Sequence, residues 1–287
     1  MYLGQFCFFK QKHLLCAVTF AAVCMLSLTA CGGDQPEDKI VITVHEYSPA
    51  MGQFVNLLPK YQEGFTEADM CREAEQYLIA GSPITLGGFG GYVTFSVGRS
   101  IKNQTGYDFR ILGNAFRQAS EEGEDAEYGN SEPGAVWVSR DDNGNGLPDD
   151  RWYELAGSDY SLPTTVRGYK KTWHKSDTTL NNPYHTQPYY PQWRQDTAFT
   201  VQGTLLAPAA RQKDGVWAQR IRDYGYADNK PNTDIAGTSF DIEWAVDEQG
   251  RKVKLDRCDF VRVMTAVDEH YPMIGELSTE VAGVALY

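Results

Sequence analysis

The sequence predicts a mainly β protein, a jelly roll or β-sandwich with one helix near the N-terminus. Three observations lead to this fold class. The chain contains many short runs of β-branched and aromatic residues, Gly, Pro, Asn and Asp separate these runs, and a single segment has helical periodicity. A composition of 42% hydrophobic and 22% charged residues is that of a packed globular chain.

The first 30 residues have the layout of a signal peptide. Lys10 and Lys12 precede an apolar run over residues 14–30, and the segment contains no acidic residue. A membrane-spanning helix is the alternative interpretation, but a run of this length is marginal for a span. The run ends in Leu-Thr-Ala before Cys31, which resembles the lipobox of bacterial lipoproteins, where a peptidase cuts before the Cys and the thiol is acylated. We expect lipidation at Cys31 and a lipid anchor in the outer membrane.

Residues 31–39 are predicted to be an acidic tether between the anchor and the folded part. Their glycines and acidic residues are similar to the export signals of surface lipoproteins in Bacteroidetes. This similarity implies exposure at the cell surface, with the periplasmic face as the alternative. Residues 40–287 contain neither a second low-complexity linker nor an internal repeat, so we expect a single β-sandwich ligand-binding domain there. The net charge of −12 opposes binding to nucleic acid.

The expected elements follow the chain in order. Residues 40–44 are a β-branched run typical of a strand. Thr66 and Asp69 have the spacing of a capping box and begin a helix. Its apolar residues recur at Met70, Ala74, Tyr77 and Leu78. Further strands are expected at residues 84–86, 92–97, 107–112, 135–139, 152–155, 198–206, 239–245 and 260–266. The glycines within 87–91 precede no helix, so they indicate a tight turn and not a phosphate site.

Two cysteines, Cys71 and Cys258, remain in the expected domain. An oxidising compartment permits a disulfide between them, and two separate buried thiols are the alternative. Cys71 lies beside the apolar stripe of the predicted helix, which favours a buried thiol at that position.

Residues 141–150 are chemically the most specific segment, because side-chain oxygens alternate along it. A calcium loop has such oxygens at its first, third and fifth positions and a Gly at the sixth, where the backbone turns sharply. The predicted ligands of a structural Ca²⁺ are Asp141, Asn143, Asn145, the carbonyl of Leu147, Asp149 and Asp150. Trp152 replaces the Glu that an EF-hand requires, and the spacing is similar to loops of thrombospondin type 3 repeats and dockerins. A metal-free hairpin is the alternative, since Asn-Gly pairs favour turns by themselves.

Aromatic residues interleaved with prolines occupy residues 169–193, and a mixed aromatic and charged segment follows at residues 217–229. Rings on a Pro-stiffened loop form a rigid contact surface, suited to stacking on sugars or on a flat macrocycle. Covering the edge of the sandwich is the equally weighted alternative. The candidate ligand-binding residues are Trp173, Tyr184, Tyr189, Tyr190, Trp193, Trp217 and Tyr226.

The sequence lacks a recognisable catalytic arrangement. It contains no Gly-x-Ser-x-Gly elbow, no His-Glu-x-x-His and no Cys in the context of a nucleophile. Among 38 acidic residues, nothing singles out a glycosidase pair. We therefore expect a binding protein and not an enzyme.

Several motifs resemble a family of Bacteroidetes cell-surface lipoproteins. They are the segments at residues 86–91, 108–116, 131–139 and 152–158, the loop at 141–150, and shorter matches at 259–263 and 278–281. The resemblance extends over most of the expected domain. It implies a jelly-roll or galactose-binding-like sandwich and an association with TonB-dependent uptake of nutrients, notably corrinoids.

Together these observations predict a surface-anchored lipoprotein that binds a nutrient and delivers it to a TonB-dependent transporter. The first candidate nutrient is a cobamide such as vitamin B12, and structural calcium would stabilise the protein. The alternatives are a glycan-binding surface module, an adhesin or structural surface protein, and a calcium-dependent enzyme acting on glycosides.

Overall fold

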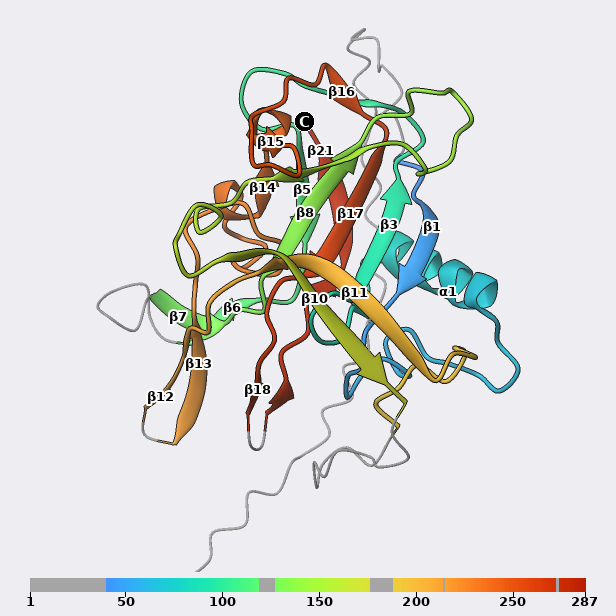
Figure 1. The fold of residues 1–287 in the computed structure, drawn as a ribbon, viewed down its shortest axis with the longest axis vertical. Coiled ribbons are helices and arrows are strands. Elements are labelled where there is room, and N and C mark those ends of the chain that lie inside the picture. Colours follow the sequence, from blue (N-terminus) through green and yellow to red (C-terminus); the bar gives the residue numbers. More distant parts are fainter. Residues whose placement is uncertain (1–39, 119–126, 176–187, 214, 272–273) are drawn as a thin grey trace, which may run out of the picture. The chain divides into compact units, whose positions relative to one another are not determined.

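Six antiparallel strands form the central sheet of the computed structural model (Figure 1). Their order across the sheet is β1 (Thr43–Ser48), β3 (Tyr92–Ser96), β17 (Phe260–Thr265), β8 (Gly134–Ser139), β9 (Trp152–Leu155) and β15 (Ala245–Val246). In the middle of the sheet, Val263 pairs with Val93 on one side and with Val136 on the other. The mainly β fold class is therefore confirmed.

The structure describes residues 40–118, 127–175, 188–213, 215–271 and 274–287. These residues belong to one compact unit, Ile40–Tyr287. Four of the sequence predictions concern positions outside the described residues. They are the signal peptide over residues 1–30, the lipidated Cys31, the tether over residues 31–39 and the aromatic Tyr184.

A second sheet of three strands packs against the central sheet. It consists of β14 (Ser239–Phe240), β5 (Phe109–Leu112) and β21 (Gly283–Leu286), with β5 in the middle. Phe109, Ile111 and Phe240 from this sheet share one hydrophobic core with Val93 and Val263 of the central sheet. This packing of two sheets is what makes the fold a sandwich.

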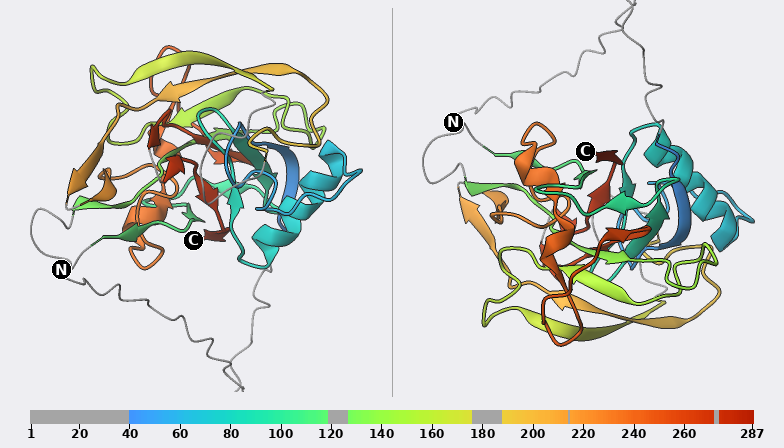
Figure 2. Two further views of the ribbon diagram at one scale, coloured as in Figure 1. Left: turned by 90° about the horizontal axis from the view of Figure 1, so that it is seen from below. Right: turned by 90° about the horizontal axis from the view of Figure 1, so that it is seen from above.

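A long two-stranded ribbon, β10 (Val166–His174) with β11 (Ala198–Leu205), crosses the opposite face of the central sheet (Figures 1 and 2). The Thr204 hydroxyl of β11 donates a hydrogen bond of 2.6 Å to Glu154 of β9. Because both faces of the central sheet are covered, β8 and β17 are buried almost throughout and do not alternate between buried and exposed residues.

The remaining strands form small sheets around this sandwich. A four-stranded sheet has the order β12 (Ala210–Lys213), β13 (Val216–Arg220), β7 (Tyr128–Asn130) and β6 (Phe116–Arg117). The two-stranded pairs are β2 (Ile84–Thr85) with β20 (Glu280–Val281), β4 (Ile101–Lys102) with β16 (Arg257–Cys258), and β18 (His270–Tyr271) with β19 (Gly275–Glu276). Two short 3₁₀-helices, η2 (Ala236–Thr238) and η3 (Ile242–Trp244), flank β14.

The helix α1 (Glu67–Ile79) lies beside β1 and begins where the sequence predicts it. The Thr66 hydroxyl accepts a hydrogen bond from the Asp69 N–H, and the Asp69 carboxylate accepts one from the Thr66 N–H. This reciprocal pair is a complete capping box. The buried residues of the helix are Met70, Ala74 and Leu78, which join the main core.

The glycine cluster at residues 87–91 is a tight turn, as expected. A Cβ atom on Gly91 would lie 1.8 Å from the Leu86 carbonyl oxygen and 2.3 Å from the Ala50 nitrogen. Gly87 and Gly90 have φ values of +66° and +79°, which residues with a side chain rarely adopt. The turn therefore depends on close contact between backbones and not on a bound phosphate.

Three expectations about secondary structure are wrong in detail. Residues 239–245 are not one strand, because η3 separates β14 from β15 and turns the chain from the small sheet to the central one. The aromatic segment from residue 169 begins inside the strand β10 and not in a loop. In its two-stranded ribbon β10 pairs only with β11, and a strand at the edge of a sheet accommodates a polar sequence such as this one. Trp217 lies in β13 and not in a loop.

Asp108 offers a test of how the small sheet is held. Its side chain is 1% exposed, and its two carboxylate oxygens accept hydrogen bonds from the N–H groups of Gln104 (2.7 Å) and Ile242 (2.8 Å). Asp108→Asn replaces one acceptor oxygen by a donor and should destabilise the protein by about 1–3 kcal/mol, measured by urea unfolding. The exposed Asp223→Asn serves as control. Equal stability of both variants would contradict this role of Asp108.

Candidate functional site

Three carboxyl side chains, those of Glu132, Asp228 and Glu280, meet where separate segments of the chain converge. Each offers an oxygen that lies within 4.8 Å of the other two. In the described part of the chain no other group of His, Cys, Asp and Glu side chains comes this close. Asp228 and Glu280 are buried, whereas Glu132 is partly exposed. We refer to these three side chains as the carboxyl cluster.

Asp228 connects the segments through their backbones. Its Oδ1 accepts hydrogen bonds from the N–H groups of Asn114 (2.8 Å) and Ala115 (2.9 Å), and its Oδ2 accepts one from the Glu280 N–H (2.9 Å). Its carbonyl accepts a further bond of 2.9 Å from the Glu132 N–H. Asp228 is the only non-glycine residue of the described chain with positive φ (50°), a conformation that Asp adopts more readily than most residues.

Glu132 and Glu280 face each other, with an oxygen of each within 4.8 Å of the other. Two carboxylates this close repel each other in a buried site, which favours a proton on one of the two groups. Ser278 links both: its N–H donates to Glu132 (3.1 Å) and its hydroxyl donates to Glu280 (2.8 Å). The Thr85 hydroxyl in turn donates to the Ser278 oxygen at 3.0 Å.

A cavity of about 380 Å³ opens beside the carboxyl cluster. Its polar lining consists of Gln53, Asn114, Asn130, Glu132, Ser278 and Glu280. Its apolar lining consists of Phe54, Leu58, Ile274 and Leu277. The volume and the mixture of apolar walls with a few polar groups are typical of a site for a small molecule or for part of a larger one.

Burial changes the protonation of the acids in and near this cavity. It raises the pKa of Glu132 to about 8, with a further contribution from the charge of Asp228. The pKa values of Asp228 and Glu280 are raised well above those of ordinary carboxyl groups, again mainly by burial. Glu276 accepts a bond of 2.6 Å from the Gln53 N–H, and burial raises its pKa to about 8. At neutral pH these four acids therefore carry much less negative charge than four ordinary, fully ionised carboxylates would.

This protonation decides what the site can do chemically. A protonated carboxyl group both donates and accepts hydrogen bonds, so the carboxyl cluster matches polar groups without charge. The carboxyl groups of glycosidases are separated by about 5 Å in retaining enzymes and by about 6.5–9.5 Å in inverting ones. Oxygens of Glu132 and Glu280 lie within 4.8 Å of each other, near the retaining separation, but burial raises the pKa of both groups, whereas a glycosidase needs one of its two carboxyl groups ionised. This protonation favours binding over hydrolysis of a glycoside.

The sequence did not single out the carboxyl cluster as a site, although its members lie in segments that attracted attention. Glu132, Asn114 and Glu280 belong to three of the motifs that resemble the lipoprotein family, and Asp228 lies in the mixed segment at residues 217–229. The sequence signal that could have found the site is an acidic residue next to a small polar residue in each of three separate segments. That these acids meet follows only from the topology.

Most of the aromatic residues predicted to bind a ligand are core residues. The exposed fractions are 2% for Tyr189, 3% for Tyr190, 3% for Trp193 and 2% for Tyr226. Trp193 stacks on Tyr47 in the main core, with ring centroids 5.9 Å apart. The expectation that these four rings form an exposed contact surface is wrong, because burying them against the sandwich removes large apolar areas from water. They cover the sheets, which was the alternative.

Trp173 and Trp217 remain partly exposed but lie on different sheets. The Trp173 Nε1 donates to the Phe89 carbonyl (3.0 Å), and the Lys171 ammonium lies 3.7 Å from the centre of its ring. The Trp217 ring lies 4.5 Å from that of Tyr271. The predicted aromatic residues within the described chain therefore do not form one surface.

The predicted calcium ligands lie in the exposed loop between β8 and β9. Both carboxylate oxygens of Asp141 accept backbone hydrogen bonds, from the N–H groups of Asn145 (3.1 Å) and Gly146 (2.9 Å). Gly146 has φ of +74°, so the chain turns at the sixth position, as the calcium pattern requires. The Leu147 N–H donates to the Asn145 side-chain oxygen at 2.8 Å.

Amide and carboxylate side chains of this loop converge on Asp149. The side-chain amides of Asn143 and Asn145 donate hydrogen bonds of 3.1 Å and 3.0 Å to the two oxygens of Asp149. The amide oxygens of these two residues accept backbone hydrogen bonds, that of Asn143 from the Asn145 N–H (2.9 Å) and that of Asn145 from the Leu147 N–H, which fixes the orientation of both amides. Asp150 accepts a bond of 3.0 Å from the Asp142 N–H and closes the loop.

Cys71 and Cys258 are separate thiols, which confirms the alternative to a disulfide. Cys258 is buried and Cys71 is partly buried, and burial raises the pKa of both thiols. Neither thiol is poised as a nucleophile. In the part of the chain that the structure describes, no helix combines the length and the apolarity needed to cross a membrane.

Comparison with known proteins gives no match for this chain: no family model fits it, and no curated protein is significantly similar to it. The function is therefore inferred from the geometry of the site itself.

The raised pKa values predict how stability depends on pH. A carboxyl group with a folded pKa above its unfolded value of about 4.3 stabilises the fold at low pH, and this contribution is lost as pH rises through the folded pKa. We expect wild-type stability in urea to fall between pH 5 and pH 9 as the buried acids ionise. Glu280→Gln keeps the shape of the protonated acid and should lose less stability over this range, by on the order of 1 kcal/mol or more.

The exposed Glu248→Gln is the matched control and should follow the wild type. Parallel loss of stability in wild type and Glu280→Gln between pH 5 and pH 9 would show that the cluster does not share protons.

Proposed function

We propose that this protein is a lipid-anchored surface protein that captures an uncharged nutrient in the cavity beside the carboxyl cluster and passes it to a TonB-dependent transporter. The observation that carries the proposal is the cavity of about 380 Å³ with acids of raised pKa and amide side chains in its lining. The signal-peptide layout, Cys31 and the acidic tether support the anchor.

The polar lining defines the chemistry of the ligand. Protonated Glu132 can donate a hydrogen bond, and Asn114 and Asn130 can both donate and accept. Carboxamide and hydroxyl groups present the same combination of donors and acceptors. A cobamide carries carboxamide side chains around its macrocycle, and we propose it as the first candidate. The cavity would take one edge of such a ligand.

A glycan is the second candidate, because sugar hydroxyls also suit these polar groups. The raised pKa values of both Glu132 and Glu280 favour a binding module over a glycoside-active enzyme, which needs one ionised carboxylate. An adhesin or structural protein would not need protonatable groups in a small cavity.

We also propose that the loop over residues 141–150 binds Ca²⁺ as a structural ion. The ligands would be Asp141, Asn143, Asn145, the Leu147 carbonyl, Asp149 and Asp150. Support comes from the turn at Gly146 and from the convergence of amide and carboxylate groups at Asp149. The ion would fix the connection between β8 and β9.

The ligand proposal is tested by calorimetric titration of the protein with cyanocobalamin. Asn114→Ala removes an exposed amide from the cavity lining and should weaken binding about tenfold, the loss expected for one hydrogen bond. Gln76→Ala, an exposed amide on α1, should leave the affinity unchanged. Heat with soluble glycans but not with cyanocobalamin would replace the first candidate by the second. Binding of neither ligand would refute capture in this cavity.

The calcium proposal is tested by thermal unfolding with added calcium and with chelator. Wild type should melt at a higher temperature in calcium, because an ion that binds only the folded state stabilises it. The double variant Asp141→Ala, Asn145→Ala should lose this difference. Identical melting of the wild type in both buffers would exclude a structural calcium ion.

A further inference from the structure

Four aromatic side chains from distant segments form a row at the surface, and we refer to them as the aromatic row. Its members in order are Tyr224, Trp244, Tyr107 and Tyr287. The ring centroids are 5.0 Å apart for the first pair, 6.1 Å for the second and 6.4 Å for the third. None of the four was a candidate ligand-binding residue in the sequence analysis.

The aromatic row is open to solvent along its length. Tyr224, Tyr107 and Tyr287 are 43%, 38% and 52% exposed, and Trp244 is partly buried against the main core. Among all aromatic side chains of the described residues, Phe116 is the only other exposed one. Concentration of exposed rings in one row is the mark of a binding surface, because such rings are otherwise buried.

The backbone around the aromatic row is firmly held. Asp108, beside Tyr107, bonds the backbone of Gln104 and of Ile242, at the start of the 3₁₀-helix that carries Trp244. The Tyr287 N–H donates to the Asp108 carbonyl (3.2 Å), and its hydroxyl lies 2.7 Å from the Ser239 hydroxyl. Rings held in this way contact a ligand at low entropy cost.

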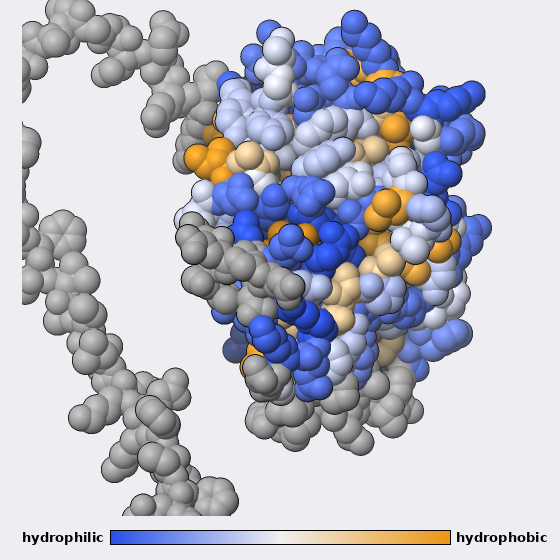
Figure 3. All heavy atoms as spheres, turned by 90° about the vertical axis from the view of Figure 1, so that its left-hand side faces the viewer, coloured by the Kyte–Doolittle hydropathy of each residue, from blue (hydrophilic) through white to orange (hydrophobic). Residues whose placement is uncertain are grey.

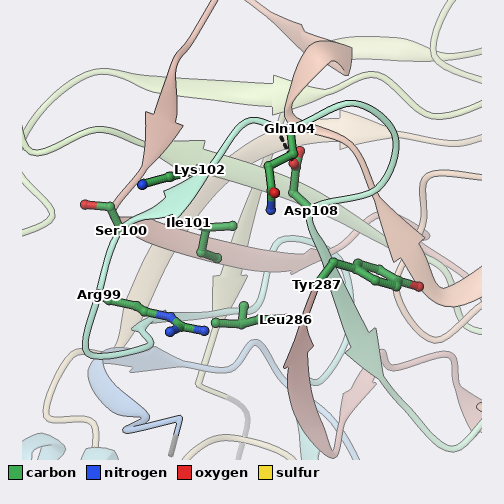
Figure 4. Close-up of a pocket in the computed structure, with 8 residues that line it drawn as sticks. All are labelled: Arg99, Ser100, Ile101, Lys102, Gln104, Asp108, Leu286 and Tyr287. Atoms are coloured by element: carbon green, nitrogen blue, oxygen red, sulfur yellow. Dashed lines mark hydrogen bonds between the residues drawn. The ribbon is translucent and has the colours of Figure 1, made fainter. Parts of the chain in front are cut away.

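A groove of about 460 Å³ continues the aromatic row beyond Tyr287 (Figure 4). Figure 4 shows Gln104, Asp108, Arg99 and Lys102 around it, with Leu286 and Ile101 toward its middle. Lys102 is exposed and makes no ion pair with the described residues. The Asp108 carboxylate already accepts two backbone hydrogen bonds and is 1% exposed, so the exposed Lys102 is the charged group of the groove most accessible to a ligand.

We propose that the aromatic row and this groove bind a glycan chain, with an acidic sugar in the groove. The C–H faces of sugar rings stack on aromatic rings, and their hydroxyl groups take the polar atoms alongside, such as Gln104. Lys102 provides the charge complementary to a sugar carboxylate or sulfate. Protein interfaces are also enriched in Tyr and Trp, but their cores are depleted of charged residues, whereas the exposed Lys102 lines the groove that continues the row. Figure 3 shows one face of the protein, on which hydrophobic side chains occur as separate groups in a hydrophilic surface.

This surface is separate from the cavity of the proposed nutrient site. Tyr107 precedes β5 and Asn114 follows it. An extended chain rises about 3.3 Å per residue, so the two ends lie roughly 20 Å apart. Both ligands can therefore bind at the same time, and each site can fail without the other.

The proposal is tested by applying the full-length protein to an array of neutral and acidic glycans. We expect binding to acidic chains that falls at least tenfold in Tyr224→Ala and in Tyr287→Ala. Lys102→Gln should weaken binding to acidic chains in particular. Phe116→Ala removes an exposed ring outside the aromatic row and should bind like the wild type. Thermal unfolding of each variant shows whether it is folded. If one Tyr variant does not fold, the other still tests the aromatic row.

Added cyanocobalamin and the Asn114→Ala variant should leave glycan binding unchanged, which separates this site from the nutrient cavity. The proposal is overturned if the wild type binds no glycan on the array. It is equally overturned if folded Tyr224→Ala and Tyr287→Ala variants both retain binding.

Discussion

The hydrogen bonds of the Asp228 carboxylate hold together segments that are 52 to 114 residues apart in sequence. Three backbone N–H groups donate to this one side chain, from the end of β5 and from the start of β20. The Asp228 carbonyl accepts the Glu132 N–H, which ties the approach to β8 to the same point. Without these bonds the buried N–H groups of Ala115 and Glu280 would lack partners, at a cost of about 1–3 kcal/mol each.

The same arrangement explains why the carboxyl cluster is tolerated. Several ionised carboxylates at this distance would repel one another strongly in a site of low dielectric. Burial raises the pKa of both Glu132 and Glu280, which lowers this charge at neutral pH, and Ser278 supplies hydrogen bonds to both. A fold can keep such acids when they serve a ligand, since apolar residues of similar size would pack at lower cost. The acids, the amides and the cavity beside them are the observations on which the proposed binding site rests.

The sequence predicts local structure well where the signal is local. The capping box at Thr66, the turn at the glycines near Gly91 and the strand over residues 152–155 need only neighbouring residues, and all three are confirmed. The aromatic residues show the limit of such patterns. Composition cannot distinguish a ring that covers a sheet, such as Trp193, from one that lies open, such as Tyr287, because burial depends on strands distant in sequence. The carboxyl cluster likewise requires the topology.

The strand β5 connects the two candidate sites, and the same chemical device fixes each of its ends. At its start, the carboxylate of Asp108 accepts two backbone N–H bonds and positions the residues that carry Tyr107 and Trp244. After its end, the carboxylate of Asp228 accepts hydrogen bonds from the N–H groups of Asn114 and Ala115. A buried aspartate that bonds backbone groups keeps loops rigid without needing a large apolar core beneath them. Two surfaces of different chemistry, one of protonatable groups and one of exposed rings, can therefore be held on a single short strand.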